Sequence, residues 1–110
     1  MLARIMFLRN EKNHPVGCLA IDFNAKKNQL KYQLSVLNPA DRFDRKMARH
    51  LALGRMLETP IHISNLKYKA SEMSLHYVFE LVMNDLVQSN VPSRAKKAAH
   101  LWLTNNLRAR

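Results

Sequence analysis

Apolar and polar positions in the first third of the chain follow the patterns of β-strands. Residues 2–8 and 16–23 are short apolar runs rich in Ile, Val and Phe, whereas residues 29–37 alternate. This alternation is typical of a sheet with one face in water. The sequence therefore predicts an antiparallel meander over residues 2–37. The alternating run places on one face Leu30, Tyr32, Leu34 and Val36, and on the other Gln29, Lys31, Gln33 and Ser35.

The period then changes, and residues 38–59 are predicted to form a helix. Asn38 can cap the first free amide groups, Pro39 suits the first turn, and Asp41 interacts favourably with the positive end of the helix dipole. On a helical projection one apolar face is expected to cover the sheet, with its glycine allowing close approach. This face consists of Phe43, Met47, Leu51, Gly54 and Leu57, with His50 at its edge.

Four cations are expected on the opposite side of this helix, within about 100° of one another. This predicted stripe consists of Arg42, Arg45, Lys46 and Arg49. Arg55 and Asp44 lie away from it, so its charge is not cancelled locally. Leu53 and Met56 lie beside it, where exposed apolar groups would suit a protein partner.

Pro60 ends the helix, and residues 60–70 predict a short strand or loop containing Ile61, Ile63 and Tyr68. Residues 71–108 predict two helices. A strand beginning near Leu75 is an alternative for the first of them. We prefer a helix because the pattern continues to Ser89. The inward positions of this helix are Leu75, Val78, Phe79, Val82 and Leu86.

Ser93 can cap the final helix, whose first turn gathers Arg94, Lys96 and Lys97. Two helices joined by a tight turn also suit a helix-turn-helix that reads DNA bases, but an ordinary packed pair with a basic end is the preferred interpretation. The inward positions of the final helix are Ala95, Ala98, Ala99, Trp102 and Leu103.

Together these elements predict an α+β fold in a single domain spanning residues 1–110. A three- or four-stranded antiparallel sheet is packed by a basic amphipathic helix, and a C-terminal helical pair completes or extends the core. A chain of 110 residues suffices for one modest core. An exposed strand edge or the apolar last helix would allow a homodimer, and monomer and dimer remain equally open.

Charge indicates the class of partner. Eighteen Lys and Arg against eight Asp and Glu give a net charge of +10, which favours a polyanion. Nucleic acid fits because neutralising its phosphates releases condensed counterions. The predicted contacts are the helical stripe and, as a second surface, Arg94, Lys96 and Lys97. DNA and RNA, and single and double strands, are not distinguished.

Other chemistry has weaker support. The five histidines, His14, His50, His62, His76 and His100, show no metal-ligand spacing, so neither a metal site nor a cofactor is predicted. A small nuclease would need residues such as His14, His50, Asp41 and Asp44 to converge, and their spacing does not require it. We therefore predict no catalytic residue. Tyr32 and Trp102 are expected to pack in the core rather than stack on bases.

Cys18 is the single cysteine, so an internal disulfide is excluded and a buried apolar role is expected. The opening run is too short for a signal peptide, and no segment is long and apolar enough to cross a membrane. These features favour a soluble protein of the cytoplasm.

The segments "NHPVGCLAI", "YQLSVLNPADRFDRK", "RHLALGRM" and "VPSRAKKAAHLWL" resemble small, basic, uncharacterised proteins of bacteriophages and other mobile elements. The resemblance covers residues 7–57 best and carries over no functional residue. It implies action in a bacterial cytoplasm on nucleic acid or on a host machine. The preferred function is therefore non-catalytic nucleic-acid binding. The alternative is an interaction protein that docks its basic surface on an acidic host protein, followed by the nuclease.

Overall fold

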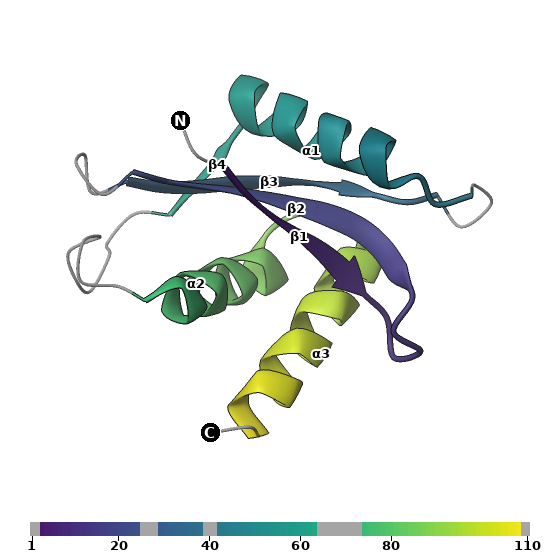
Figure 1. The fold of residues 1–110 in the computed structure, drawn as a ribbon. Helices are drawn as coiled ribbons and strands as arrows, with labels where there is room; N and C mark the ends of the chain where they lie inside the picture. The colour runs from purple at the N-terminus through teal and green to yellow at the C-terminus, as the bar shows by residue number, and fades with distance from the viewer. Residues whose placement is uncertain (1–2, 25–28, 39–41, 64–73, 109–110) are drawn as a thin grey trace.

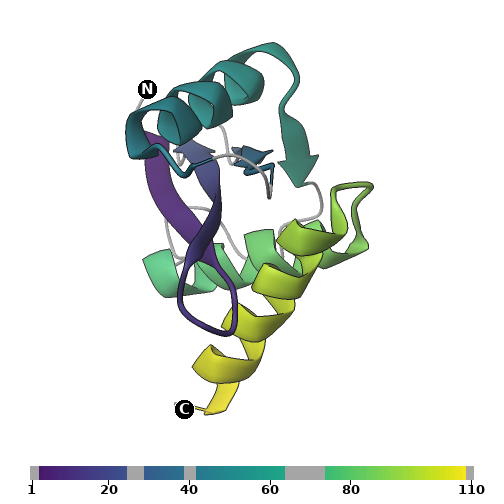
Figure 2. The same ribbon diagram turned by 90° about the vertical axis from the view of Figure 1, so that its right-hand side faces the viewer.

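The computed structural model describes residues 3–24, 29–38, 42–63 and 74–108, which form one antiparallel sheet and three helices. The helix α1 packs on one face of the sheet, and α2 and α3 pack on the other (Figures 1 and 2). The predicted α+β class and C-terminal helical pair are confirmed. The strands are β1 (Ala3–Arg9), β2 (Pro15–Asn24), β3 (Gln29–Val36) and β4 (Ile61–Ile63), and the helices are α1 (Arg45–Glu58), α2 (Leu75–Gln88) and α3 (Ser93–Arg108).

The strands lie in the order β1-β2-β3-β4, so the first three form the predicted meander and β1 is an edge strand. The β1–β2 turn is closed by Asn10, whose Oδ1 accepts hydrogen bonds from the amides of Lys12 and His14. Asn13 adopts a positive φ of 64° there, a conformation that asparagine tolerates. The predicted short strand after Pro60 is β4, while Tyr68 lies outside the described residues.

The core between the sheet and α2/α3 contains the large apolar side chains. Leu19, Ile21 and Tyr32 from the sheet are fully buried against Val82 and Leu86 of α2. Small side chains of α3 complete this core, and α2 and α3 also pack against each other. The inward faces predicted for both helices are confirmed except for Leu75, which is 44% exposed; Phe79 and Trp102 are half-buried and pack against this core. The α3 side chains in the core are Ala95, Ala98, Ala99 and Leu103.

The choice of helix for the segment after residue 74 is confirmed. Ser74 caps α2, and its side chain accepts a hydrogen bond from the Tyr77 amide. Residues 71–73 lie outside the described part of the chain. The strand alternative loses because the buried positions of α2, Val78, Val82 and Leu86, recur at intervals of four and match one helix face against the sheet.

The predicted start of α1 at Asn38 is wrong, because the helix begins at Arg45 after the cap Asp44. The carboxylate of Asp44 accepts a hydrogen bond from the Met47 amide at 3.1 Å. The chain is still paired with β2 at Leu37, while the first helical residue, Arg45, already contacts Phe7 of β1. The connection must therefore cross from β3 to β1, a distance of about 10 Å for strands about 4.8 Å apart, before α1 can begin.

The predicted buried face of α1 is also wrong. The residues that pack on the sheet are Ala52 and Met56, both fully buried, with Ala48 and Leu53 half-buried. Of the predicted inward residues, Phe43 is half-buried and contacts Phe7 of the sheet, whereas those within the helix face away from the sheet. Their exposed fractions are 55% for Met47, 42% for Leu51 and 61% for Leu57, while Gly54 adjoins open space.

The sheet surface under α1 explains this rotation. It carries the small side chains of Cys18 and Ala20, and Ser35 donates a hydrogen bond from its Oγ to the Ala48 carbonyl at 2.8 Å. A face of alanines can approach such a surface more closely than large side chains can. The polar face predicted for β3 is therefore covered in part: Ser35 is buried and Gln33 donates to the Thr59 carbonyl at 2.8 Å, whereas Gln29 is exposed.

Candidate nucleic-acid interface

The first two turns of α1 lie beside the edge strand β1 and form a shallow groove of about 490 Å³ with it. Three cations of α1, Arg45, Lys46 and Arg49, line this groove, and Arg4 of β1 joins them. All four residues are exposed. The remaining lining residues are apolar, and no described carboxylate lines the groove. We call this feature the Arg45 groove; its lining residues are Ala3, Arg4, Ile5, Phe7, Arg45, Lys46 and Arg49.

Aromatic contacts fix the position of Arg45. Its Cζ lies 5.0 Å from the centroid of the Phe7 ring, in a cation–π arrangement. Phe43, just before α1, meets the same ring edge-on at 5.7 Å. Phe7 therefore supports the guanidinium and is covered on two sides. The Arg45 groove offers charge and hydrogen-bond donors rather than an open stacking surface.

Cys18 lies beneath α1, and the positive charge of the groove affects the pKa of its thiol. Burial raises the pKa of the Cys18 thiol to about 11, and the positive charge of Arg49 opposes this rise in part. The thiol is fully buried and neutral at physiological pH, as its predicted apolar role requires. A thiolate nucleophile at this place is disfavoured.

The structure changes the composition of the predicted stripe. Arg45, Lys46 and Arg49 come together, but they flank the sheet edge instead of lying on the side of α1 opposite the sheet. Arg42 precedes the helix and borders a different hollow, together with Leu37 and Phe43. Arg4 was missed as a site residue. The available signal was a cation within the first apolar run, on a strand that could form a sheet edge.

The second predicted surface lies on α3, on the other face of the sheet from α1. Arg94 is half-buried and donates a hydrogen bond to the Leu37 carbonyl, so it joins α3 to the end of β3. Lys96 is also half-buried, and Lys97 is exposed beside Glu11. These residues do not extend the Arg45 groove, and Arg94 has a structural role.

The residues considered for catalysis or metal binding are dispersed. All five histidines are exposed; His14 lies in the β1–β2 turn and His50 on the outer side of α1. Asp44 is engaged as the α1 cap, and Asp41 lies outside the described residues. Within the part of the chain that the structure describes, no three His, Cys, Asp or Glu residues are grouped in a way that could hold a metal ion. None of the helices in that part is both long and apolar enough to cross a bilayer.

Comparison of the chain with protein-family models, with curated proteins and with solved structures gives no significant match. An α+β fold of this kind does not define an activity by itself. The Arg45 groove and its surroundings are therefore the features of the molecule that indicate its function.

Proposed function

We propose that the protein binds nucleic acid through backbone phosphates, without catalysis, and that the Arg45 groove is its main contact surface. The observation that carries this proposal is the convergence of Arg4, Arg45, Lys46 and Arg49 on one groove that no described carboxylate lines. Guanidinium groups bind phosphate oxygens in pairs of parallel hydrogen bonds, which suits this arrangement.

Two further features support the proposal. The net charge of +10 draws any polyanion toward the molecule, while the groove provides a defined place for contact. Three of its four cations lie on successive turns of a capped helix, so their spacing is fixed before binding. Following the resemblance noted above, the proposal includes a bacteriophage or mobile-element origin and action in a bacterial cytoplasm.

The test is fluorescence anisotropy of nuclease-treated protein with labelled DNA and RNA over a salt series. The variant Arg45→Gln/Lys46→Gln/Arg49→Gln should bind more weakly and lower the slope of log K against log salt by about 2–3, because each phosphate contact contributes about 0.7–0.9. The matched control Lys12→Gln/Arg42→Gln/Lys97→Gln loses the same charge outside the groove. It should keep most of the slope. Equal losses in the two variants would show that general charge, not the groove, supports binding.

A second candidate function rests on the outer side of α1. Met47, Leu51 and Leu57 are exposed there, and two of them border a hollow of about 430 Å³ together with Phe43. Exposed apolar groups beside cations suit an interaction protein that docks on an acidic host protein. Pull-down after nuclease treatment with wild type and Met47→Ser/Leu51→Ser separates the two functions. Loss of a protein partner in this variant, with nucleic-acid affinity retained, would favour the adaptor.

The nuclease is the third candidate, and it is tested by incubating labelled RNA and DNA with the protein, with and without divalent metal. A homodimer remains a further proposal, since β1 leaves one strand edge free of sheet partners among the described residues.

A further inference from the structure

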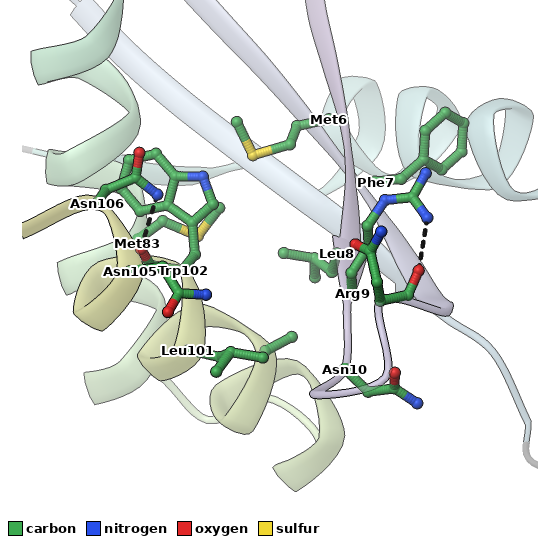
Figure 3. A pocket seen from close by; sticks show the side chains of 12 residues that line it. Met6, Phe7, Leu8, Arg9, Asn10, Met83, Leu101, Trp102, Asn105 and Asn106 are labelled. Carbon is green, nitrogen blue, oxygen red and sulfur yellow. Dashed lines mark hydrogen bonds between the residues drawn. The ribbon is translucent and has the colours of Figure 1, made fainter. Parts of the chain in front are cut away.

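A second hollow lies against β1, on the side of the sheet that faces α3 (Figure 3). Its volume is about 250 Å³. Side chains alternate along a strand, so β1 presents Phe7 to the Arg45 groove and Met6 and Leu8 to the opposite core. The two recesses therefore flank the same edge strand. We call this hollow the Trp102 pocket; its lining includes Met6, Leu8, Asn10, Trp102, Asn105 and Asn106.

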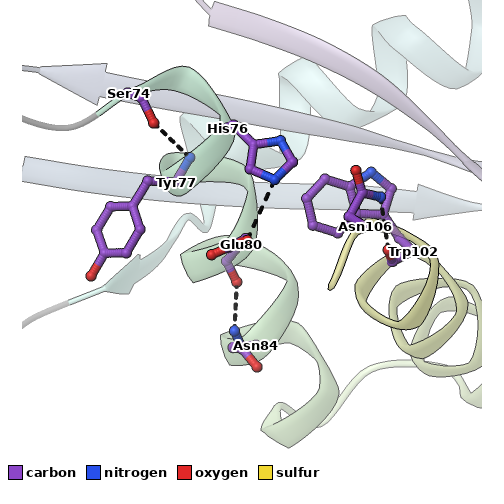
Figure 4. A network of polar contacts seen from close by, with 7 residues as sticks. All are labelled: Ser74, His76, Tyr77, Glu80, Asn84, Trp102 and Asn106. Atoms are coloured by element: carbon purple, nitrogen blue, oxygen red, sulfur yellow. Dashed lines mark hydrogen bonds and ion pairs between the residues drawn. The ribbon is translucent and has the colours of Figure 1, made fainter. Parts of the chain in front are cut away.

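Trp102 gives this pocket an aromatic wall that is held from the α2 side. The His76 ring lies 5.6 Å from the indole at an angle of 33°, and Phe79 meets the indole edge-on at 6.5 Å. His76 is itself placed by Glu80, with 3.4 Å between Nε2 and Oε1 (Figure 4). The indole is therefore fixed in position while part of it still lines the hollow.

Three residues with carboxamide side chains, Asn10, Asn105 and Asn106, also line the pocket. Asn105 is exposed. Asn10 uses its oxygen to accept from two turn amides, which leaves its NH₂ group as a donor. Asn106 is anchored by donation from its Nδ2 to the Trp102 carbonyl at 2.8 Å. An aromatic wall with amide donors and acceptors beside it matches a nucleobase, which has a flat π-face and a polar edge.

We infer that the Trp102 pocket accepts one unpaired nucleobase of a single-stranded nucleic acid whose phosphates follow the β1 edge to the Arg45 groove. This inference rests on the proposed function and narrows its substrate to single strands of DNA or RNA. Ligand sites for larger molecules start at about 300 Å³, so a pocket of about 250 Å³ suits one base. A base within a duplex is stacked and paired and cannot enter it.

The experiment uses the intrinsic fluorescence of Trp102, the only tryptophan of the chain. Wild-type protein is titrated at low salt with oligo(dT), oligo(U) and a DNA duplex of the same length. Saturable change in emission is expected with the single strands and not with the duplex. Comparison of oligo(U) with a further probe, oligo(dU), which carries the same base on deoxyribose, shows which sugar is preferred. The variant Asn105→Leu replaces a polar residue of the pocket lining by an apolar one and should weaken single-strand binding about tenfold, the order of one lost base contact.

Two controls separate this inference from the proposed function. Thr104→Leu adds the same side chain at an exposed α3 position outside the pocket and should bind like wild type. The groove variant Arg45→Gln/Lys46→Gln/Arg49→Gln should lose affinity but keep the emission change at saturation. Equal binding of duplex and single strand, without a selective emission change, would overturn the base pocket and leave phosphate binding intact. Absence of binding to every probe would overturn both.

Discussion

The two faces of the sheet are covered in different ways. Against α2 and α3, large side chains such as Leu19, Tyr32 and Leu86 form the main core. Against α1, the buried set is small, with Ala52 and Met56 resting on Cys18 and Ala20. Hydrogen bonds from Ser35 and Gln33 add to this thinner layer. One face of the sheet therefore supplies most of the apolar burial, whereas the other positions a basic helix beside the sheet edge.

Truncation of buried side chains should give the largest contrast between the two layers. Leu86→Ala is expected to lower the free energy of unfolding by about 3–5 kcal/mol, because it leaves a cavity among fully buried neighbours. Met56→Ala should lower the free energy of unfolding by about 2 kcal/mol, since the thin α1 layer can move to fill part of the cavity. Urea denaturation followed by circular dichroism measures both values. A cost for Met56→Ala equal to that for Leu86→Ala would contradict the division into a main core and a thin layer.

Removal of a polar contact should also cost more stability in the main core than in the α1 layer. Both losses in the free energy of unfolding should be smaller than those from truncation in the same layer. The Tyr32 hydroxyl donates to Asp85 Oδ2 at 2.7 Å and also contacts Ser89 at 3.1 Å. Tyr32→Phe removes a donor from a partly buried carboxylate and should cost about 1–3 kcal/mol. Ser35→Ala breaks the neutral bond to the Ala48 carbonyl and should cost about 0.5–1.5 kcal/mol. A larger loss in the free energy of unfolding for Ser35→Ala than for Tyr32→Phe, measured by urea denaturation, would contradict this order.

Alkaline pH provides a further test of the α1 layer, through the buried thiol of Cys18. The folded-state pKa of Cys18 is raised from about 9 to about 11, chiefly by burial. The unfolded chain therefore releases the thiol proton first, so stability present below pH 9 is lost as the pH rises toward 11. The loss should be about 1–2 kcal/mol. Unfolding measured from pH 8 to pH 11 should show a steeper decline for wild type than for Cys18→Ala.

Tyr32 titrates in the same direction and must be separated from Cys18. Burial and the hydrogen bond to Asp85 raise the pKa of Tyr32 above its ordinary range. Rising pH therefore also lowers the free energy of unfolding through Tyr32. Both proteins in the comparison keep Tyr32, so the difference between their curves isolates the thiol. Parallel curves for wild type and Cys18→Ala would contradict the assignment.

Local sequence patterns were sufficient for most of the fold. The strands of the meander, the existence of three helices and the buried faces of α2 and α3 follow from periodicity, because each depends on side chains meeting one large apolar core. The excess of cations is a property of composition and needs no structure. The main failures concern α1. Its predicted start and its predicted buried face are wrong, and of the predicted stripe Arg45, Lys46 and Arg49 share a groove whereas Arg42 lies outside it.

These errors share one physical cause, which is the surface that α1 meets. On a helical projection, the large apolar side chains favour burial of Met47 and Leu51. In the structure, the face of α1 that carries Ala52 packs instead against Ser35 and the small side chains of β2. The same rotation sets Arg45 and Arg49 beside β1. The crossing from β3 to β1 leaves Arg42 outside the helix. These outcomes depend on the sheet residues that α1 meets in the folded structure, which the helical pattern of α1 does not contain.

Periodicity and composition are sufficient to predict the strands, the helices, the main core and the positive charge. Which cations share a groove and which side chains form a pocket follows from the tertiary structure. Arg4 joins Arg45, and Trp102 faces Met6, across long stretches of chain. These contacts between distant parts of the chain depend on how the helices pack on the two faces of the sheet. Local sequence patterns do not specify that packing.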